Sequence, residues 1–215
     1  YVPQLYLKGF TFKKSDNGHF FWYLNLQHGA SKETTPAKVC KEAYLYTYQT
    51  DDGPDDIVER KFKVAEDLAA PIIKRITETH QLPIEQDLAE LVGFITLQVV
   101  RTISFRSFVD HHINHSIQGW AKADVTALDA KERYSEVFKN TSGFNFEEFQ
   151  NLILEDGLEW EGTQKYHLLS MLQHFGDLLM HFLERVWCLF ILPDSSKRGF
   201  ITSDNPVSCG IGSQG

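Results

Sequence analysis

The sequence predicts an α+β domain in which strands near both ends of the chain form one sheet, with three long helices between them. Two observations predict this class. Apolar and aromatic runs of strand length lie near both ends, and between them apolar residues recur at three- and four-residue spacing. A chain of 215 residues is long enough for a single domain, residues 1–215. Because the chain starts at Tyr1 without a methionine and ends in a Gly/Ser run, we expect both ends to be trimmed.

The first 48 residues are predicted to be rich in β structure. The aromatic run 19–26 is the strongest strand candidate, and the turn formers at 16–18 precede it. Together they predict a hairpin whose first arm is Leu5 to Phe12. Residues 49–56 are also turn formers and predict a linker.

Apolar periodicity predicts the first two long helices. One covers about 57–80, and Pro71 is expected to kink or interrupt it. The second begins near Pro83-Ile84, and its pattern allows it to continue past Arg106 toward Trp120.

The second half of the chain contains two more predicted helices and a pair of strands. Asn145 is a candidate N-cap for a short helix at 146–155, and the third long helix covers about 163–185. The continuous apolar run 186–192 predicts a strand. A turn that follows should bring 199–202 back to pair with it.

Composition excludes several classes of protein. The formal net charge of −8 opposes broad electrostatic attraction to nucleic acid or anionic membranes, although it permits a local basic pocket. The three cysteines are far apart, which predicts neither a disulfide framework nor a zinc finger. No apolar stretch has the length of a membrane span, and the N-terminus lacks a signal pattern. We therefore expect a cytoplasmic protein without a membrane partner.

Three segments carry a family resemblance. They are Tyr1-Val2-Pro3-Gln4-Leu5-Tyr6-Leu7-Lys8-Gly9-Phe10, Gln98-Val99-Val100-Arg101-Thr102-Ile103-Ser104-Phe105-Arg106, and Phe200-Ile201-Thr202-Ser203-Asp204-Asn205-Pro206-Val207. In this order they resemble a bacterial family known as domain of unknown function 4238. The resemblance frames nearly the whole chain and implies no particular activity or fold.

The central segment supplies candidate anion-binding residues. Gln98 and Arg101 share a face if the segment is helical, and Arg106 lies more than a turn further along. Guanidinium groups suit phosphates and carboxylates because they present a planar fork of donors. The structural alternative is that these arginines pair with carboxylates at the edge of the core.

The last segment places an acidic residue at the end of a short predicted strand. Asp204, with Asn205 beside it, is in a usual position for a carboxylate that binds metal or acts as a base. The alternative is an ordinary turn, because Ser, Asp, Asn and Pro are the commonest turn residues.

Histidines supply further candidates. His111 and His115 have the spacing of a metal-binding helix, with His112 between them, and Asp110 or Asp204 is a candidate third ligand. The alternative is a solvated surface. Arg106 and His111 also fit the loose Arg-x4-His spacing found in metal-independent ribonucleases of the HEPN type.

A second set of histidines, His167, His174 and His181, repeats every seven residues along the third long helix. Successive members are about 10 Å apart, too far for one metal ion. The set is interpreted as a solvated face, or as the source of a His–Asp acid–base pair built with Asp177.

The predicted site is one cleft that the three segments form together, containing Gln4, Gln98, Arg101, Arg106 and Asp204. As an enzyme, the protein would be a hydrolase or nuclease of a bacterial defence or toxin system, acting on a nucleic acid, a nucleotide or another phosphate-containing substrate. Arg101 and Arg106 would hold phosphate, with Gln4, Gln98 and Asn205 binding substrate. Asp204 with a histidine would bind a divalent metal or move protons. The alternative is a non-enzymatic ligand-sensing or protein-interaction domain with an anion-binding cleft.

Overall fold

The fold was analysed in a computed structural model. It describes residues 2–15, 18–39, 46–50, 53–139, 145–155, 158–193, 195–196 and 199–208. The chain forms two compact units, which are treated separately below. The first comprises Tyr1–Phe105 with Leu168–Gly215, and the second comprises Arg106–His167. The expectation of a single domain stays a prediction.

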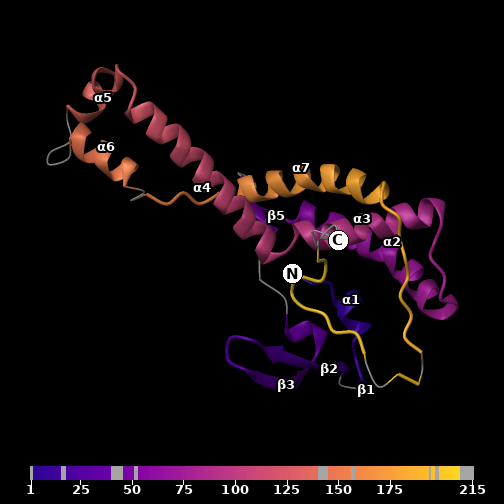
Figure 1. The fold of residues 1–215 in the computed structure, drawn as a ribbon. Coiled ribbons are helices and arrows are strands. Elements are labelled where there is room, and N and C mark those ends of the chain that lie inside the picture. The colour runs from indigo at the N-terminus through magenta and orange to yellow at the C-terminus, as the bar shows by residue number, and fades with distance from the viewer. Residues whose placement is uncertain are drawn as a thin grey trace, which may run out of the picture. The chain divides into compact units, whose positions relative to one another are not determined.

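The described residues contain helices together with short antiparallel strands, which confirms the α+β class (Figure 1). The elements that begin in the first unit are α1 (Gln4–Lys8), β1 (Lys13–Ser15), β2 (Gly18–Asn25), β3 (Ala30–Thr34), η1 (Pro36–Lys38), β4 (Tyr48–Thr50), β5 (Gly53–Asp55), α2 (Ile57–Thr79), α3 (Glu85–Val100) and α4 (Ile103–Val125). Those that begin in the second unit are α5 (Ala130–Phe138), α6 (Phe146–Leu154) and α7 (Gln164–Leu183).

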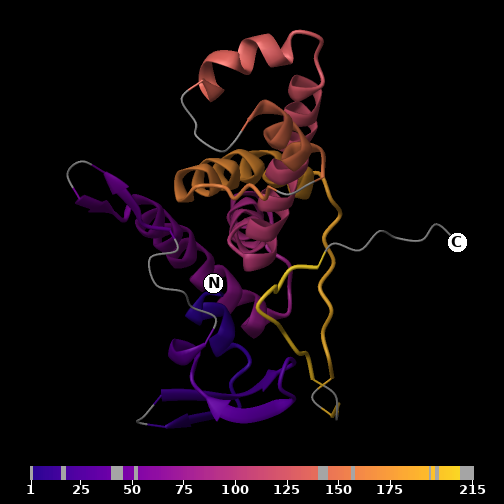
Figure 2. The same ribbon diagram turned by 90° about the vertical axis from the view of Figure 1, so that its left-hand side faces the viewer.

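The N-terminal sheet, whose indigo and violet strands are visible in Figure 2, has the strand order β1-β2-β3. β2 matches the predicted strand at 19–26, and it pairs with β3 so that Trp22 lies opposite Glu33. The predicted first arm, Leu5 to Phe12, is wrong. The first half of that segment belongs to α1, and the arm is β1 instead, because Leu7 and Val2 pack with Phe21 in a small core that a helical turn fills. The predicted turn residues 16 and 17 are outside the described residues.

The predicted linker at 49–56 is also wrong, because its described part forms the antiparallel hairpin β4-β5.

Neither of the two predicted C-terminal strands is formed by the described residues. The described residues of 186–192 and 199–202 have no strand structure, and most of their apolar side chains are exposed. High β propensity favours an extended backbone, but a strand also needs a neighbouring chain for its N–H and C=O groups. No such neighbour accompanies these runs in the described part of the chain.

The main core of the first unit is formed by α2, α3 and the part of α7 that belongs to it. Phe62, Leu97 and Met171 are among its buried residues, and Tyr46 joins them from before the β4-β5 hairpin. The helix predicted at 57–80 is confirmed as α2. It continues through Pro71, so the expected interruption is wrong, while the expected kink stays a prediction. The neighbouring Ala69 and Ile72 are buried.

The helix that was allowed to run from Pro83-Ile84 toward Trp120 is divided into α3 and α4. Thr102 causes the break. Its hydroxyl donates to the Val99 carbonyl at 3.0 Å and accepts from the Phe105 N–H at 3.1 Å, so the side chain replaces backbone partners at the junction. The Tyr46 hydroxyl donates to the carbonyl of Arg101, which lies at the break between the two helices.

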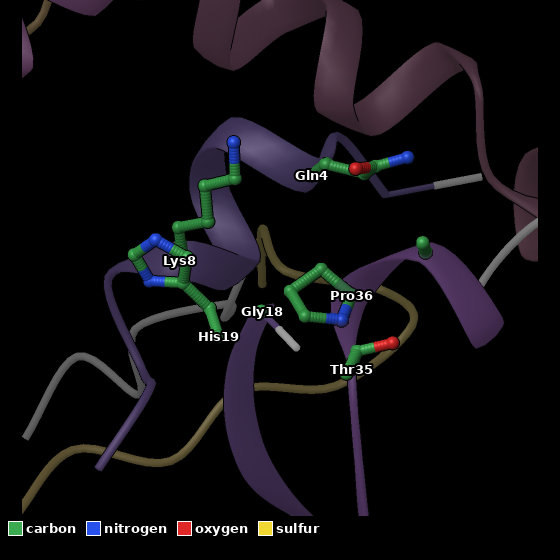
Figure 3. Close-up of a pocket in the computed structure, with 7 residues that line it drawn as sticks. Gln4, Lys8, Gly18, His19, Thr35 and Pro36 are labelled. Atoms are coloured by element: carbon green, nitrogen blue, oxygen red, sulfur yellow. The ribbon is translucent and has the colours of Figure 1, made fainter. Parts of the chain in front are cut away.

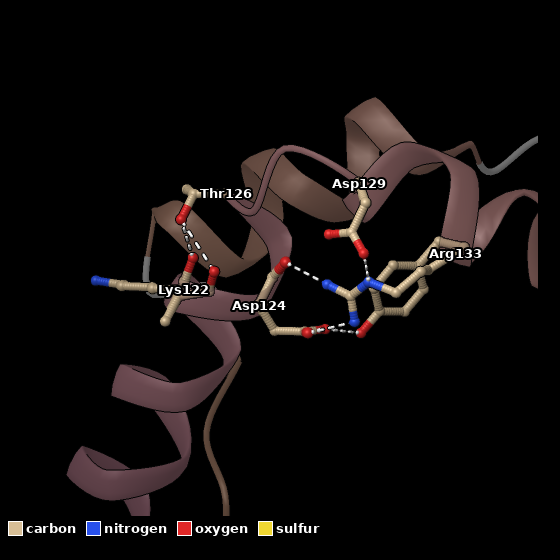
Figure 4. A network of polar contacts seen from close by, with 7 residues as sticks. Lys122, Asp124, Thr126, Asp129 and Arg133 are labelled. Carbon is tan, nitrogen blue, oxygen red and sulfur yellow. Dashed lines mark hydrogen bonds and ion pairs between the residues drawn. The ribbon is translucent and has the colours of Figure 1, made fainter.

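In the second unit, α5 and α6 pack through an aromatic cluster of Tyr134, Phe138, Phe146 and Phe149. No helix was predicted from the sequence at the position of α5. Its position is fixed by Arg133, which contacts Asp124 at 2.6 Å and Asp129 at 3.1 Å (Figure 4). The Tyr134 hydroxyl donates to Asp124 at 2.5 Å, and this bond, with Arg133, lowers the pKa of the Asp124 carboxyl.

No single helix in the described part of the chain is long and apolar enough to cross a membrane. The bent pair α3 and α4 meets the length and composition criteria only when the two helices are counted together.

The predicted N-cap at Asn145 is confirmed, and it yields a stability prediction. Its side chain accepts from the N–H groups of Glu147 and Glu148, while Glu148 accepts from the Asn145 N–H, completing a capping box. Asn145→Ala should destabilise the fold by about 1 kcal/mol, lowering Tm by roughly 2–4 °C in thermal denaturation followed by circular dichroism. Asn151→Ala, in the same helix and exposed, is the control and should leave Tm nearly unchanged. Equal effects of the two substitutions would contradict the capping role.

Candidate functional site

Arg101 is the most deeply buried charged residue among those described in the first unit. Its side chain is 0% exposed, and its Nη1 lies 3.0 Å from Oε1 of Glu66 on α2. The guanidinium also lies over the Phe62 ring, 4.6 Å from the centroid, and 6.0 Å from that of Tyr46. This geometry matches the structural alternative, in which the arginine pairs with a carboxylate at the edge of the core.

Two other polar groups accompany Arg101. Gln98, one turn earlier on α3, donates from Nε2 to the Phe94 carbonyl at 3.1 Å, and its Oε1 is buried without a hydrogen-bond partner among the described residues. Burial raises the pKa of Glu59, against the opposing attraction of Arg101. The end of α3 is therefore a polar inclusion in the core, not an open anion site.

Gln4 lines a pocket of about 190 Å³ between α1, β2 and η1 (Figure 3). The other polar side chains that line it are Lys8, His19 and Thr35, and the close-up shows Lys8 and His19 on one side with Gln4 and Thr35 on the other. All four can donate hydrogen bonds, and none has a partner among the described residues. None of the described residues that line this pocket has a carboxylate.

Asp204 and Asn205 are exposed in a bend. Ser203, not Asp204, closes this bend, because its hydroxyl accepts from the Asn205 N–H at 3.1 Å and donates to the Asn205 carbonyl. Asp204 has no hydrogen bond or ion pair within the described residues. Two positions earlier, the Thr202 hydroxyl lies 2.9 Å from the hydroxyl of Tyr6 on α1. Two of the three family segments therefore meet in the first unit.

The predicted cleft residues differ in their surroundings. Gln98 and Arg101 are buried, whereas Gln4 and Asp204 are exposed, and of these four only Gln4 lines the pocket. Arg106 belongs to the second unit. The common cleft is still only a prediction.

In the second unit, Arg106 belongs to a group of four polar side chains. Its guanidinium donates to the side-chain oxygen of Gln164. One turn further along α4, Asp110 Oδ1 lies 3.0 Å from Nε2 of His167. The same oxygen accepts from the Gly162 N–H at 2.9 Å.

His167 is well enclosed. Its side chain is only 10% exposed, and its Nδ1 is buried without a partner in the part of the chain that is described. If Nε2 carries the ring proton and donates it to Asp110, Nδ1 retains a lone pair. An imidazole that is oriented by a carboxylate and has its second nitrogen available is the arrangement of a general base.

Sequence reasoning named both members of this pair without joining them. Asp110 appeared as a metal ligand and His167 as one of three periodic histidines, and nothing in a single sequence joins residues so far apart on two helices. The metal-site hypothesis for the other histidines is not supported by a cluster of ligands. The described residues contain no group of three or more His, Cys, Asp or Glu side chains suited to a metal ion. His111, His112 and His115 are exposed on α4.

The raised pKa of Glu59 predicts a pH-dependent stability. A folded-state pKa above its ordinary value of 4.5 means that the folded protein keeps the proton longer than the unfolded chain does. This group's contribution to stability is then greatest in acid and is lost as pH rises through the folded-state pKa. Glu59→Gln should raise Tm at pH 7 and have little effect below pH 4.5. Glu78→Gln, exposed on the same helix, is the control; a lower Tm for Glu59→Gln at pH 7 would contradict the prediction.

Comparison with known proteins yields a family match and no individual relative. No match to this chain was found among curated proteins or among solved structures. The family model described as a protein of unknown function (DUF4238) matches residues 1–213. The chain therefore belongs to the DUF4238 family.

Proposed function

We propose that the protein is a hydrolase of phosphate esters in which His167 is the general base and Asp110 orients it. The observation that carries the proposal is the 3.0 Å contact between Asp110 Oδ1 and His167 Nε2, together with the Nδ1 of the same ring, which has no partner among the described residues. A base needs a fixed orientation and an available lone pair, and this pair provides both.

Arg106 supplies the positive charge that a phosphate requires. It precedes Asp110 by four positions on α4, a rise of about 6 Å along the helix. Gln164 is its one hydrogen-bond partner among the described residues, so further guanidinium donors remain for phosphate oxygens. In this proposal, Arg106 retains the phosphate-holding role expected from the sequence, and Arg101 takes no part in the reaction. The proton-moving role expected of Asp204 with a histidine passes to Asp110 and His167.

The reaction balances without a further reactant. His167 Nδ1 takes a proton from a water molecule, and the water oxygen forms a bond to phosphorus. The ester P–O bond breaks, and the leaving alkoxide receives the proton from the imidazolium. Arg106 stabilises the negative charge that accumulates on the non-bridging oxygens. Nucleic acids and nucleotides are the first substrates to test, in keeping with the expected nuclease of a defence or toxin system.

Substitutions at the pair test this proposal. His167→Gln and Asp110→Asn should each reduce kcat at least about 100-fold, which is the lower range for a positioned acid–base group. The assay follows hydrolysis of RNA, single-stranded DNA and bis-p-nitrophenyl phosphate. Arg106→Gln should mainly raise KM and reduce kcat/KM. His115→Ala, exposed on the same helix, is the control for loss of fold. Full activity in a folded His167→Gln variant rules out the assignment.

A second candidate function rests on the pocket that Gln4, Lys8 and His19 line. The described lining residues of this pocket include four hydrogen-bond donors and no carboxylate, which is unusual in a chain with net charge −8 and favours a small anion such as a phosphate group. A pocket of about 190 Å³ holds such a group more readily than a whole nucleotide. Binding here needs no reaction and corresponds to the ligand-sensing alternative.

This second candidate predicts phosphate binding without turnover. Inorganic phosphate or pyrophosphate should raise Tm, by an amount that grows with the logarithm of its concentration above Kd. Lys8→Gln combined with His19→Gln should abolish that shift in calorimetry and thermal denaturation. Lys14→Gln, on the neighbouring strand β1 and outside the pocket, should leave it intact. An unchanged phosphate-dependent shift in the double variant assigns binding elsewhere.

A further inference from the structure

The segment 158–164 is bonded to α4 by a regular series of polar contacts. Gln118 Nε2 donates to the Leu158 carbonyl at 3.3 Å, and Asn114 Oδ1 accepts from the Trp160 N–H at 3.2 Å. Asp110 Oδ1 accepts from the Gly162 N–H, and Arg106 donates to Gln164. We call residues 158–163 the strap.

The contacts keep a constant register. Each step of four residues back along α4, from 118 to 106, corresponds to two residues forward along the chain, from 158 to 164. Four helical residues rise about 6 Å, and two extended residues span about 6.6 Å. Because these two lengths are nearly equal, side chains on one face of α4 contact every second residue of the segment that runs beside it (Figure 1).

The strap lies directly against the proposed base. A Cβ atom placed on Gly162 would be 2.9 Å from His167 Nε2 and 3.2 Å from Cε1, the carbon between the two ring nitrogens. Glycine at this position therefore lets the strap backbone touch the imidazole edge. This close approach covers the Nε2–Cε1 edge of the His167 ring.

The contacts of the strap suit a segment that opens. Its two outer contacts use the neutral side chains of Asn114 and Gln118, each with a single hydrogen bond. Glu159 and Glu161, between the bonded positions, are exposed. Segments with few buried apolar contacts and side-chain tethers open at a lower free energy than the core around them.

We infer that the strap is a lid that gates access of substrate to His167 and opens while the rest of the second unit stays folded. The inference rests on the proposed function for its purpose, since a covered base must be uncovered before it contacts substrate. Opening breaks the contacts of Asn114 and Gln118 and removes the Gly162 backbone from the imidazole.

Histidine modification tests the lid without depending on catalysis. Diethylpyrocarbonate labels accessible imidazoles, and peptide mass spectrometry measures each rate. In the full chain His167 should label far more slowly than exposed His28. Asn114→Ala and Gln118→Ala should each increase the His167 rate about 2- to 12-fold, the range that corresponds to the loss of one hydrogen bond. Ser116→Ala, exposed on α4, should not increase it.

Hydrogen exchange separates local opening from unfolding. The amides of Trp160 and Gly162 should exchange at a rate that low denaturant concentrations leave unchanged, while the amide of buried Val109 follows global unfolding. An unchanged His167 labelling rate in the Asn114→Ala/Gln118→Ala double variant overturns the lid. So does exchange of the strap amides with the denaturant dependence of Val109. If the strap opens but His167→Gln keeps full activity, the lid stands and the proposed function fails.

Discussion

The first unit depends on the burial of one guanidinium. Arg101 is placed where α3 ends, and its charge is compensated by Glu66 from α2 and by the face of the Phe62 ring. Removing one partner of a buried ion pair leaves an uncompensated charge, which costs about 3–5 kcal/mol. The arginine therefore ties α2 to the α3–α4 junction. The Tyr46 hydroxyl donates to the carbonyl of Arg101, and this bond connects the segment before the β4-β5 hairpin to the same junction.

This burial decides which of the two arginines is available for chemistry. Arg101 and Arg106 are five positions apart and look alike in the sequence, yet the break at Thr102 separates their environments. Arg101 completes α3 and is enclosed in the core. Arg106 lies on α4, one turn from Asp110, with a neutral amide as its described partner. A guanidinium neutralised by a carboxylate attracts a phosphate less strongly than one bonded to an amide, so only Arg106 suits the proposed reaction.

Structure that depends on neighbouring residues, such as a helix cap, could be predicted from the sequence. Contacts between residues far apart in the chain could not, because a single sequence does not specify them. Asn145 was recognised as a cap because its partners lie within three residues, and α2 and α7 follow from periodicity. The strand predicted at 186–192 needed a neighbouring strand, expected at 199–202. The composition of the run does not determine whether that pairing forms. Asp110 and Gly162 are 52 positions apart, and their contact depends on how α4 and the strap pack. The same limit applies to the pair of Asp110 with His167.

Asp110 joins the two proposals for the second unit, because a single carboxylate oxygen serves both. Oδ1 accepts from the Gly162 N–H at 2.9 Å and lies 3.0 Å from His167 Nε2. An oxygen shared by two donors bonds each of them less strongly than it would bond one alone. When the strap leaves in this proposal, Asp110 keeps His167 as its remaining described donor from this pair, so the carboxylate still orients the imidazole. In the two proposals together, one oxygen atom therefore has two roles: it holds the strap in the closed state, and it orients the base in both states.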